Sequence, residues 1–427
     1  MLVIVLVALL CRVSFLYHLY SLGGEPISIL GFTLTEPGLY REGLPAYFFS
    51  PDAQSYDTLA MHLLAGEGLW MEDYRGLNGD RGIPVRSFRP VMMPLYLAGV
   101  YRIAGHCYLA ARCGLIVLST ASCILVYLLG RRLVGETGAW LAALGAAFYP
   151  KLVYYSTMLS TETLYIFFLL LSFVLLYRAA DRMGWWNWVV AGVALALAIL
   201  TRSVLAAFVP LTLVWLLVSL DSKWAALRNF VVLSLGVAGG MSPWVIRNYA
   251  VHGQLVPMTT EGGFTLWVTN NEDFDKTYAV KGGGSNYLPP EGSKARRLLE
   301  GAREVEIDKI FYRLAWDYIR EHPGAFVRTA GRKFLDFWRP YPRPRAVGFW
   351  PALVAAAAFL PVLLLAAWAV VARRRHWRDL SLVYLLILYY TAVHMIFMSV
   401  TRYRMPLEPF MLILAGATLA SILGHDE

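Results

Sequence analysis

Long apolar runs joined by short polar connections make up most of the chain. A transmembrane helix needs about 20 mainly apolar residues to cross the hydrocarbon core of a bilayer. The runs predict ten spans, at about residues 1–20, 109–129, 138–153, 160–177, 186–201, 203–220, 229–246, 348–371, 379–398 and 405–423. This pattern predicts an all-α polytopic membrane protein and excludes a soluble globular enzyme.

Two long polar segments, residues 21–108 and 247–347, interrupt the series of spans. The first contains a helical pattern after Pro51 and a short apolar helix after Pro94, both suited to lie flat at the membrane interface. The second begins with the pattern of strands and turns in GQLVPMTTEGGFTLWVTNN and continues through the Gly-rich loop KGGGSNYLPPEG. It ends in an amphipathic helix at about 294–320 and another after Pro323.

The spans and polar segments predict three parts. Residues 1–246 form an N-terminal transmembrane module whose first external loop, 21–108, carries the candidate chemistry. Residues 247–347 form an external soluble segment with a small amount of α/β structure, and residues 348–427 form the C-terminal transmembrane helices.

Composition supports the membrane assignment. Hydrophobic residues make up 58% of the chain and charged residues 16%, whereas an ordinary soluble domain is about 45–50% apolar and about 25% charged. The net charge of +9 does not indicate nucleic acid, because Lys and Arg gather in the short connections between spans.

The basic connections also predict the orientation. If the chain crosses the membrane ten times, the connections after the second, fourth, sixth and eighth spans lie on one side. Their basic residues are Arg131, Arg132, Arg178, Arg182, Lys223, Arg228, Arg373, Arg374, Arg375 and Arg378. Positive charge favours the cytoplasmic side. We therefore expect a multi-pass protein of the cell inner (plasma) membrane, with both termini cytoplasmic and both long polar segments on the periplasmic or extracellular side.

The first residues and the cysteines add little chemistry. No basic residue precedes the first apolar run and Arg12 interrupts it, so we interpret it as a retained transmembrane helix and not a cleaved signal. Packing roles are expected for the cysteines, Cys11, Cys107, Cys113 and Cys123, which contain no CxxC pair. His62 and His106 also lack metal-ligand spacing, so we expect no resident metal, although a divalent ion is compatible with the sequence.

Acidic residues at the outer ends of spans are the first candidates for catalysis. Asp52 and Asp57 follow the first span, where a carboxylate can accept a proton from an attacking hydroxyl. Alternatively, Ser50 caps a helix that starts at Pro51, and Asp52 complements the helix dipole. Glu162 opens the fourth span, where it is either a functional acid with Lys151 as its partner or an acid at a helix start that Ser160 or Thr161 caps.

Arginines lie on the same predicted face. Arg202, Arg247, Arg402 and Arg404 each stand at the outer end of a span. A guanidinium presents a planar fork of donors that matches phosphate oxygens, so these residues suit a lipid phosphate at the interface. The alternative is that each side chain simply extends from a helix end to the membrane surface.

Four stretches in order along the chain resemble a known superfamily: PDAQSYDTLAMHLLAGEG with RPVMMPLYLAGVYRIAG after it, STETL, PWVIRNYAVHGQLVPMTTEGGFTLWVTNN, and RYRMPLEPF. They are similar to bacterial membrane glycosyltransferases related to the dolichyl-phosphate-mannose-protein mannosyltransferases, glycosyltransferase family 39 and relatives, which have the GT-C fold. The resemblance implies a GT-C-like bundle with external juxtamembrane helices. It also implies a polyprenyl-phosphate-linked sugar donor and inversion at the anomeric carbon.

The resemblance assigns residues as well. Asp52 matches the family's catalytic acid, Ala53 replaces a frequent Glu beside it, and Asp57 is a candidate substitute. Glu162 matches an acid that opens a later span. Substrate binding is predicted for Tyr56, Arg89, Lys151, Arg202, Arg247, Asn248, Arg402 and Arg404.

These inferences predict sugar transfer, with no nucleic-acid partner, to a glycan, lipid or protein acceptor on the outer face. Asp52 would take the acceptor's proton, aided by burial that raises its pKa, while arginines hold the departing phosphate. The runner-up is a transporter or lipid flippase, which would need polar residues within several spans and usually repeated halves. A non-catalytic scaffold, with both external segments as binding surfaces, is a third hypothesis.

Overall fold

The computed structural model describes residues 1–21, 25–29, 32–36, 51–72, 83–182, 184–274, 289–290, 292–342 and 348–424. Its first part contains α1 (Leu2–Ser21), β1 (Glu25–Ile29), β2 (Phe32–Glu36), α2 (Pro51–Leu64), β3 (Met71–Glu72), β4 (Pro84–Val85), α3 (Met92–Ala104), α4 (Tyr108–Val134), α5 (Glu136–Phe148), α6 (Pro150–Tyr155), α7 (Thr161–Arg182), α8 (Trp185–Thr201), η1 (Ser203–Phe208), α9 (Val209–Ser219) and α10 (Lys223–His252). The remainder contains α11 (Gly262–Trp267), α13 (Lys294–Leu299), α14 (Glu304–Glu321), α15 (Pro323–Trp338), α17 (Phe349–Ala372), η2 (Arg374–His376), α18 (Trp377–Ile396), η3 (Met405–Leu407) and α19 (Glu408–Ile422).

The fold is a bundle of long apolar helices, which confirms an all-α multi-pass membrane protein. Within the described residues, seven helices are long and apolar enough to cross a membrane, namely α1, α4, α7, α10, α17, α18 with η2, and α19 with η3. The other predicted spans correspond to shorter helices, α5, α8 and α9 with η1. In the case of α5 the reason is Pro150, which has no amide hydrogen to continue the helix begun at Glu136.

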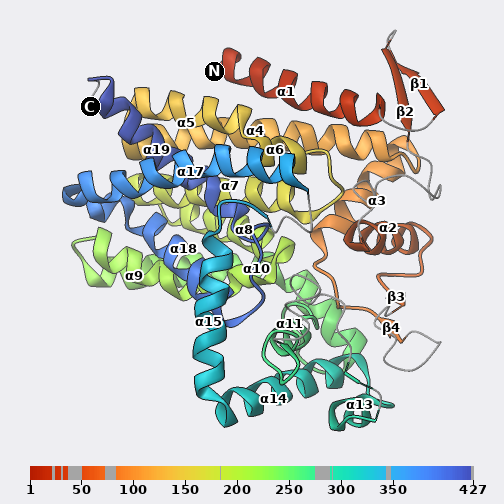
Figure 1. Ribbon diagram of the computed structural model, residues 1–427. Coiled ribbons are helices and arrows are strands. Elements are labelled where there is room, and N and C mark those ends of the chain that lie inside the picture. The colour runs from red at the N-terminus through yellow and green to blue at the C-terminus, as the bar shows by residue number, and fades with distance from the viewer. Residues whose placement is uncertain are drawn as a thin grey trace.

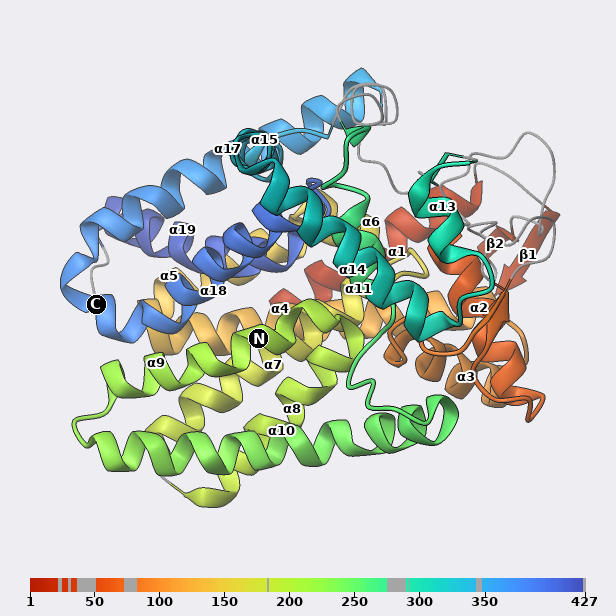
Figure 2. The same cartoon turned by 90° about the horizontal axis from the view of Figure 1, so that it is seen from below.

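Two of the long helices lie on opposite sides of the bundle. Figure 2 shows α10 along one side and α17 along the other. Large apolar side chains on both helices are open to the surroundings, including Leu235 at 65% and Leu364 at 62% exposure. Such surfaces are unusual for a soluble protein and suit contact with lipid tails.

The two ends of the bundle differ in their elements. In Figure 1 the long helices run across the picture, with α2, α3 and the strands at their right-hand end and α11, α13 and α14 below them. At the opposite end, Arg132 joins Asp181 at 2.9 Å and Asp379 at 3.9 Å, so the basic connections after α4, α7 and α17 meet there. The strands form two small antiparallel pairs, β1 with β2 and β3 with β4.

The external helices match the sequence in part. Helix α2 begins at Pro51 as predicted, and α3 begins at Met92, just before Pro94. Ser50, the proposed cap of α2, lies outside the described residues, as does most of the Gly-rich loop at 281–292. The amphipathic helix predicted at 294–320 is divided into α13 and α14, because Gly301 adopts a φ of 72°.

The strands predicted after residue 252 were wrong for the described part of that segment, which contains the short helix α11. Phe264 and Trp267, three residues apart, both pack on Phe311 of α14, with ring centroids 5.4 and 5.0 Å away. Gly263 permits this approach, since a Cβ there would lie 2.1 Å from the Asp308 carbonyl oxygen. Packing on a neighbouring helix therefore decides the local structure.

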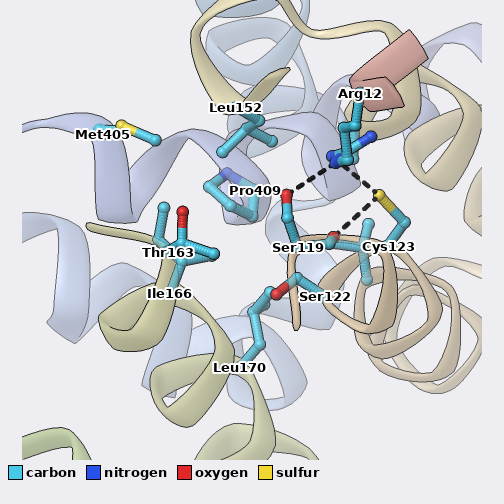
Figure 3. A pocket seen from close by; sticks show the side chains of 12 residues that line it. Arg12, Ser119, Ser122, Cys123, Leu152, Thr163, Ile166, Leu170, Met405 and Pro409 are labelled. Atoms are coloured by element: carbon cyan, nitrogen blue, oxygen red, sulfur yellow. Dashed lines mark hydrogen bonds between the residues drawn. The ribbon is translucent and has the colours of Figure 1, made fainter. Parts of the chain in front are cut away.

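Helix α1 is attached to the bundle through Arg12. Its guanidinium, with no exposed surface, donates to Ser119 Oγ at 2.8 Å and to the Ala147 carbonyl at 3.1 Å. Ala147 lies in the last turn of α5, where backbone carbonyls lose their helical donors. The adjoining cavity (Figure 3) has a volume of about 10 Å³, enough for about one water molecule.

Helices α8 and α10 approach closely through glycines. A Cβ on Gly192 would lie 2.3 Å from the Leu233 carbonyl oxygen, and one on Gly236 would lie 2.5 Å from that of Val189. We expect Gly192→Leu to separate these helices, lower the midpoint of thermal unfolding in detergent and reduce the yield of monodisperse protein. Gly239→Leu is the matched control, because nothing lies within 4 Å of its added Cβ. Equal losses in both variants would contradict the packing argument.

Candidate active site

Asp52 stands at the first turn of α2 between two arginines. Its Oδ1 lies 3.0 Å from Nη2 of Arg89, and its Oδ2 accepts a hydrogen bond of 2.9 Å from Nη1 of Arg402. The Asp52 side chain is 26% exposed and that of Arg402 is 28% exposed. Both side chains of the pair are therefore partly exposed.

Glu162, in the first turn of α7, has no exposed surface and holds two arginines. Arg402 binds both of its oxygens, through Nε to Oε1 and through Nη2 to Oε2, the latter at 3.1 Å. Arg202, which caps the C-terminus of α8, also binds Oε1 and donates to Thr161 Oγ1 at 3.1 Å. One buried carboxylate thus keeps two guanidinium groups side by side.

A sixth member extends this arrangement. Arg89 Nη1 lies 3.2 Å from Oε1 of Glu261, a residue just before α11. We call the set the acid–arginine cluster; acids and arginines alternate along it in the order Glu261, Arg89, Asp52, Arg402, Glu162, Arg202. Its three negative charges balance its three positive charges. Each arginine of the cluster already has an acid as its partner, so an additional anion that bound one of these arginines would lie close to that acid.

Helix ends bring the cluster together. Asp52 and Glu162 lie in first turns, Arg202 lies at a C-terminus, and Arg402 lies in the turn between α18 and α19. Such ends carry unpaired backbone groups and polar residues, and in a membrane bundle they meet at its surfaces. Because α7 has 22 residues, Glu162 lies about 30 Å from the basic connections at the helix's other end.

The electrostatics of Asp52 differ from the sequence-based expectation. Burial is the largest single influence and raises its pKa, as predicted. The charges of Arg89 and Arg402 together outweigh burial, and the pKa of Asp52 is lowered from its ordinary value. The expectation of a raised pKa for Asp52 was therefore wrong in its net direction, because the sequence alone did not reveal the two arginines. Burial lowers the pKa of Arg402, but the negative charges of Glu162 and Asp52 outweigh it, and the pKa of Arg402 is raised. Deprotonation of Arg402 would leave both acids without this partner.

Aromatic rings line the cluster. The Arg202 guanidinium lies 5.7 Å from the ring centroid of Tyr165 and 5.6 Å from that of Tyr403. Tyr56, a predicted binding residue, is buried with its ring 5.8 Å from the guanidinium of Arg89. An aromatic ring attracts a guanidinium but carries no net charge, so these rings hold the side chains of Arg202 and Arg89 in position and leave their positive charge unchanged.

Lys151 and Arg404 belong to a neighbouring network. Lys151 binds Glu408 Oε1 at 2.8 Å and the Thr401 carbonyl at 2.7 Å, so the predicted pairing with Glu162 was wrong. The reason is that α6 directs Lys151 toward α19, while arginines occupy both oxygens of Glu162. Arg404 is buried and also binds Glu408, at 3.2 Å. The Thr401 contact connects this network to the turn that carries Arg402.

Asp57 lies in a different cluster from Asp52. Its Oδ1 accepts hydrogen bonds from Tyr101 at 2.7 Å and faces His106 Nε2 at 2.9 Å, and its Oδ2 accepts from Tyr108 at 3.1 Å. These partners come from α3, α4 and the connection between them. The contacts join α2 to the next two helices and do not bring Asp57 into the acid–arginine cluster.

Arg247 and Asn248 contact the segment just before Arg89 in the chain. Arg247 donates to Ser87 Oγ at 3.0 Å, and Asn248 Oδ1 accepts from the same hydroxyl at 2.9 Å. Glu304, at the start of α14, accepts the Ser87 amide at 2.8 Å. This network fixes the segment that carries Arg89, two residues later. Glu304 and Glu261 were not predicted from the sequence, because nothing in their local patterns distinguishes them from surface acids.

The acids of the site pair with the guanidinium groups of arginines. Among the residues that the structure describes, no group of three or more His, Cys, Asp and Glu side chains is placed to hold a metal ion. The candidate acids Asp52 and Glu162 instead share Arg402. Within the described residues, the positively charged groups that face these two acids are guanidinium groups.

Comparison with known proteins supports the fold. A family model described as dolichyl-phosphate-mannose-protein mannosyltransferase matches residues 88–246. This range contains Arg89, Glu162 and Arg202. A search of curated protein sequences gives no match.

Solved structures match almost the whole chain. The oligosaccharyltransferase of Archaeoglobus fulgidus in its apo form shares 12% identity, with a TM-score of 0.58 over 99% of this chain and 50% of that chain. The same enzyme tethered to an acceptor peptide containing the NVT sequon gives 13% identity and a TM-score of 0.57, over 99% and 49%. Its complex with an inhibitory peptide and a dolichol-phosphate gives 12% and 0.56, over 99% and 50%. The chain spans about half the length of these enzymes and has the fold of GT-C glycosyltransferases.

Proposed function

We propose that this protein transfers a sugar from a polyprenyl-phosphate donor to an acceptor hydroxyl at the membrane surface that carries the acid–arginine cluster. The observation that supports this proposal most directly is the position of Arg402. One edge of its guanidinium binds the buried acid Glu162, and the other edge faces Asp52. Such an arginine is a preorganised donor for a phosphate whose negative charge grows during reaction. The family model and the dolichol-phosphate bound by a structural relative support this donor class.

Five of the six residues of the cluster, and Lys151 beside it, have a role in this proposal. Asp52 accepts the proton of the attacking hydroxyl, and the oxygen attacks the anomeric carbon from the face opposite the phosphate, which inverts that carbon. Arg402 and Arg202 bind the leaving phosphate, and Glu162 fixes both arginines. Arg89 orients Asp52, while Lys151 adds positive charge beside the Arg402 turn. A divalent ion is not required by this scheme.

We also propose that the site lies on the periplasmic or extracellular side of the cell inner membrane. It stands about 30 Å from the basic connections that hold Arg132 and its partners. Positive charge favours the cytoplasmic side, so the cluster would lie on the outer side. Labelling a cysteine introduced near Arg402 with an impermeant reagent in intact cells tests this orientation.

The proposed activity is tested by supplying purified protein with polyprenyl-phosphate sugars and measuring release of polyprenyl phosphate. Arg402→Lys should lower turnover by about 10²–10³-fold, because an ammonium cannot bind Glu162 and a phosphate with the same planar geometry. Arg132→Lys is the matched control, since its exposed pair lies at the opposite end of the bundle. Flipping of lipid without release of polyprenyl phosphate would instead support a flippase.

A further inference from the structure

The Arg402 nitrogen that Glu162 leaves unoccupied already has an anion beside it in the free protein. Glu162 occupies Nε and Nη2, which leaves Nη1 as the nitrogen turned away from the buried acid. At 2.9 Å from this nitrogen lies Asp52 Oδ2. Arg402, proposed to bind the donor phosphate, and Asp52, proposed to accept the proton, are therefore hydrogen-bonded to each other before any substrate arrives.

We infer that Asp52 and the donor phosphate compete for Arg402, so that Asp52 is held unreactive in the free protein and becomes available as a base when phosphate binds. This inference rests on the proposed function. Its geometric basis is the position of Arg402: one edge of the guanidinium binds Glu162, which has no exposed surface, and the other faces Asp52, whose side chain is 26% exposed.

Arg89 makes this exchange feasible. It contacts Asp52 Oδ1, whereas Arg402 contacts Oδ2, so Asp52 can lose one partner and keep the other. Glu261 holds the second terminal nitrogen of Arg89 at 3.2 Å and limits how far that arginine can follow an incoming phosphate. Asp52 would therefore stay in place while Arg402 changes its anion.

The charges balance through the reaction. The donor phosphodiester carries one negative charge and Asp52 carries another. When the acceptor oxygen bonds to the anomeric carbon, the bond from that carbon to the phosphate oxygen breaks, and its electron pair leaves with the phosphate. The acceptor proton passes to Asp52, which becomes neutral, while the phosphate becomes dianionic. One negative charge has thus moved from one side of Arg402 to the other.

The same exchange explains how the product can leave. Neutral Asp52 does not compete for Arg402, so the dianionic polyprenyl phosphate remains bound after transfer. When Asp52 loses its proton to water, its carboxylate regains Nη1 and displaces the phosphate. Donor binding and product release would then be opposite directions of one exchange.

Binding of farnesyl phosphate, a short polyprenyl monophosphate, to the full chain in detergent tests the inference. Asp52→Asn removes the competing charge and should tighten binding by about tenfold, even though this variant transfers sugar far more slowly. Asp52→Ser also removes the charge and replaces the carboxylate with a small hydroxyl, so it should tighten binding similarly and controls for new contacts made by the amide of Asn. Glu261→Gln removes a nearby negative charge without freeing Arg402 and should change affinity by less than about twofold.

Unchanged or weaker binding in both Asp52 variants would overturn the exchange, as would equal tightening in Glu261→Gln. The proposed function fails differently. In that case the unaltered protein would bind no farnesyl phosphate and release no polyprenyl phosphate from any sugar donor. Sugar transfer by the unaltered protein combined with unchanged affinity in Asp52→Asn would retain the glycosyltransferase and reject only the exchange.

Discussion

Asp52→Asn is expected to lower sugar transfer by about 10²–10⁴-fold, the range for loss of a positioned proton acceptor. The amide keeps the size of the side chain but cannot take the acceptor proton. It also removes the charge between Arg89 and Arg402, which lie 3.0 and 2.9 Å from the two carboxylate oxygens. Release of polyprenyl phosphate from a sugar donor, measured in purified protein, gives the rate.

Asp57→Asn provides the comparison, because it is another acid on α2 with a different environment. Its partners are Tyr101, His106 and Tyr108, so its loss should weaken the contact of α2 with α3 and α4. We expect transfer to fall by less than about tenfold, in line with the modest net worth of such hydrogen bonds. A loss as large as that in Asp52→Asn would restore Asp57 as a candidate base.

The sequence was sufficient to predict the helical bundle and to place Glu162, Arg202 and Arg402 at the ends of its helices. Apolar runs of sufficient length have few alternatives to membrane helices, and the ends of those helices fix where Glu162, Arg202 and Arg402 emerge. The helices after Pro51 and Pro323 followed from proline at a helix start, which the structure confirms. These features depend on local pattern and chain direction.

Partnerships within the site did not follow from the same reasoning. Arg402 and Asp52 are separated by 350 positions, and Arg402 and Glu162 by 240. Side-chain pairing at this range depends on how helices pack, which no local pattern encodes. For that reason Lys151 was paired with the wrong acid, and Glu261 and Glu304 were missed.

The same limit explains the incorrect pKa expectation. Burial of Asp52 was predictable from its place at the edge of an apolar bundle, and its effect alone would have produced a stronger base. Two arginines reversed the sign. What distinguishes this candidate site is therefore the set of charges brought together around Asp52, more than the chemistry of Asp52 itself.

Glu162→Gln should have the largest effect on stability, because it leaves Arg202 and Arg402 together without the acid that both bind. Breaking a buried ion pair by removing one partner typically costs about 3–5 kcal/mol. The side chain has no exposed surface, so water cannot replace the lost charge. A large fall in the midpoint of thermal unfolding, together with loss of transfer, is the expected result.

Asp181→Asn tests whether that fall comes from charge at a buried site. Asp181 lies near the other end of α7 and pairs with Arg132, but its side chain is 45% exposed, so the loss should be at most about 1 kcal/mol. Adding Arg202→Gln to Glu162→Gln should restore part of the stability, since it removes one of the two uncompensated charges. If the double variant is less stable than Glu162→Gln alone, repulsion between the arginines is not the cause. The buried acid would then act mainly by fixing the end of α8 against α7.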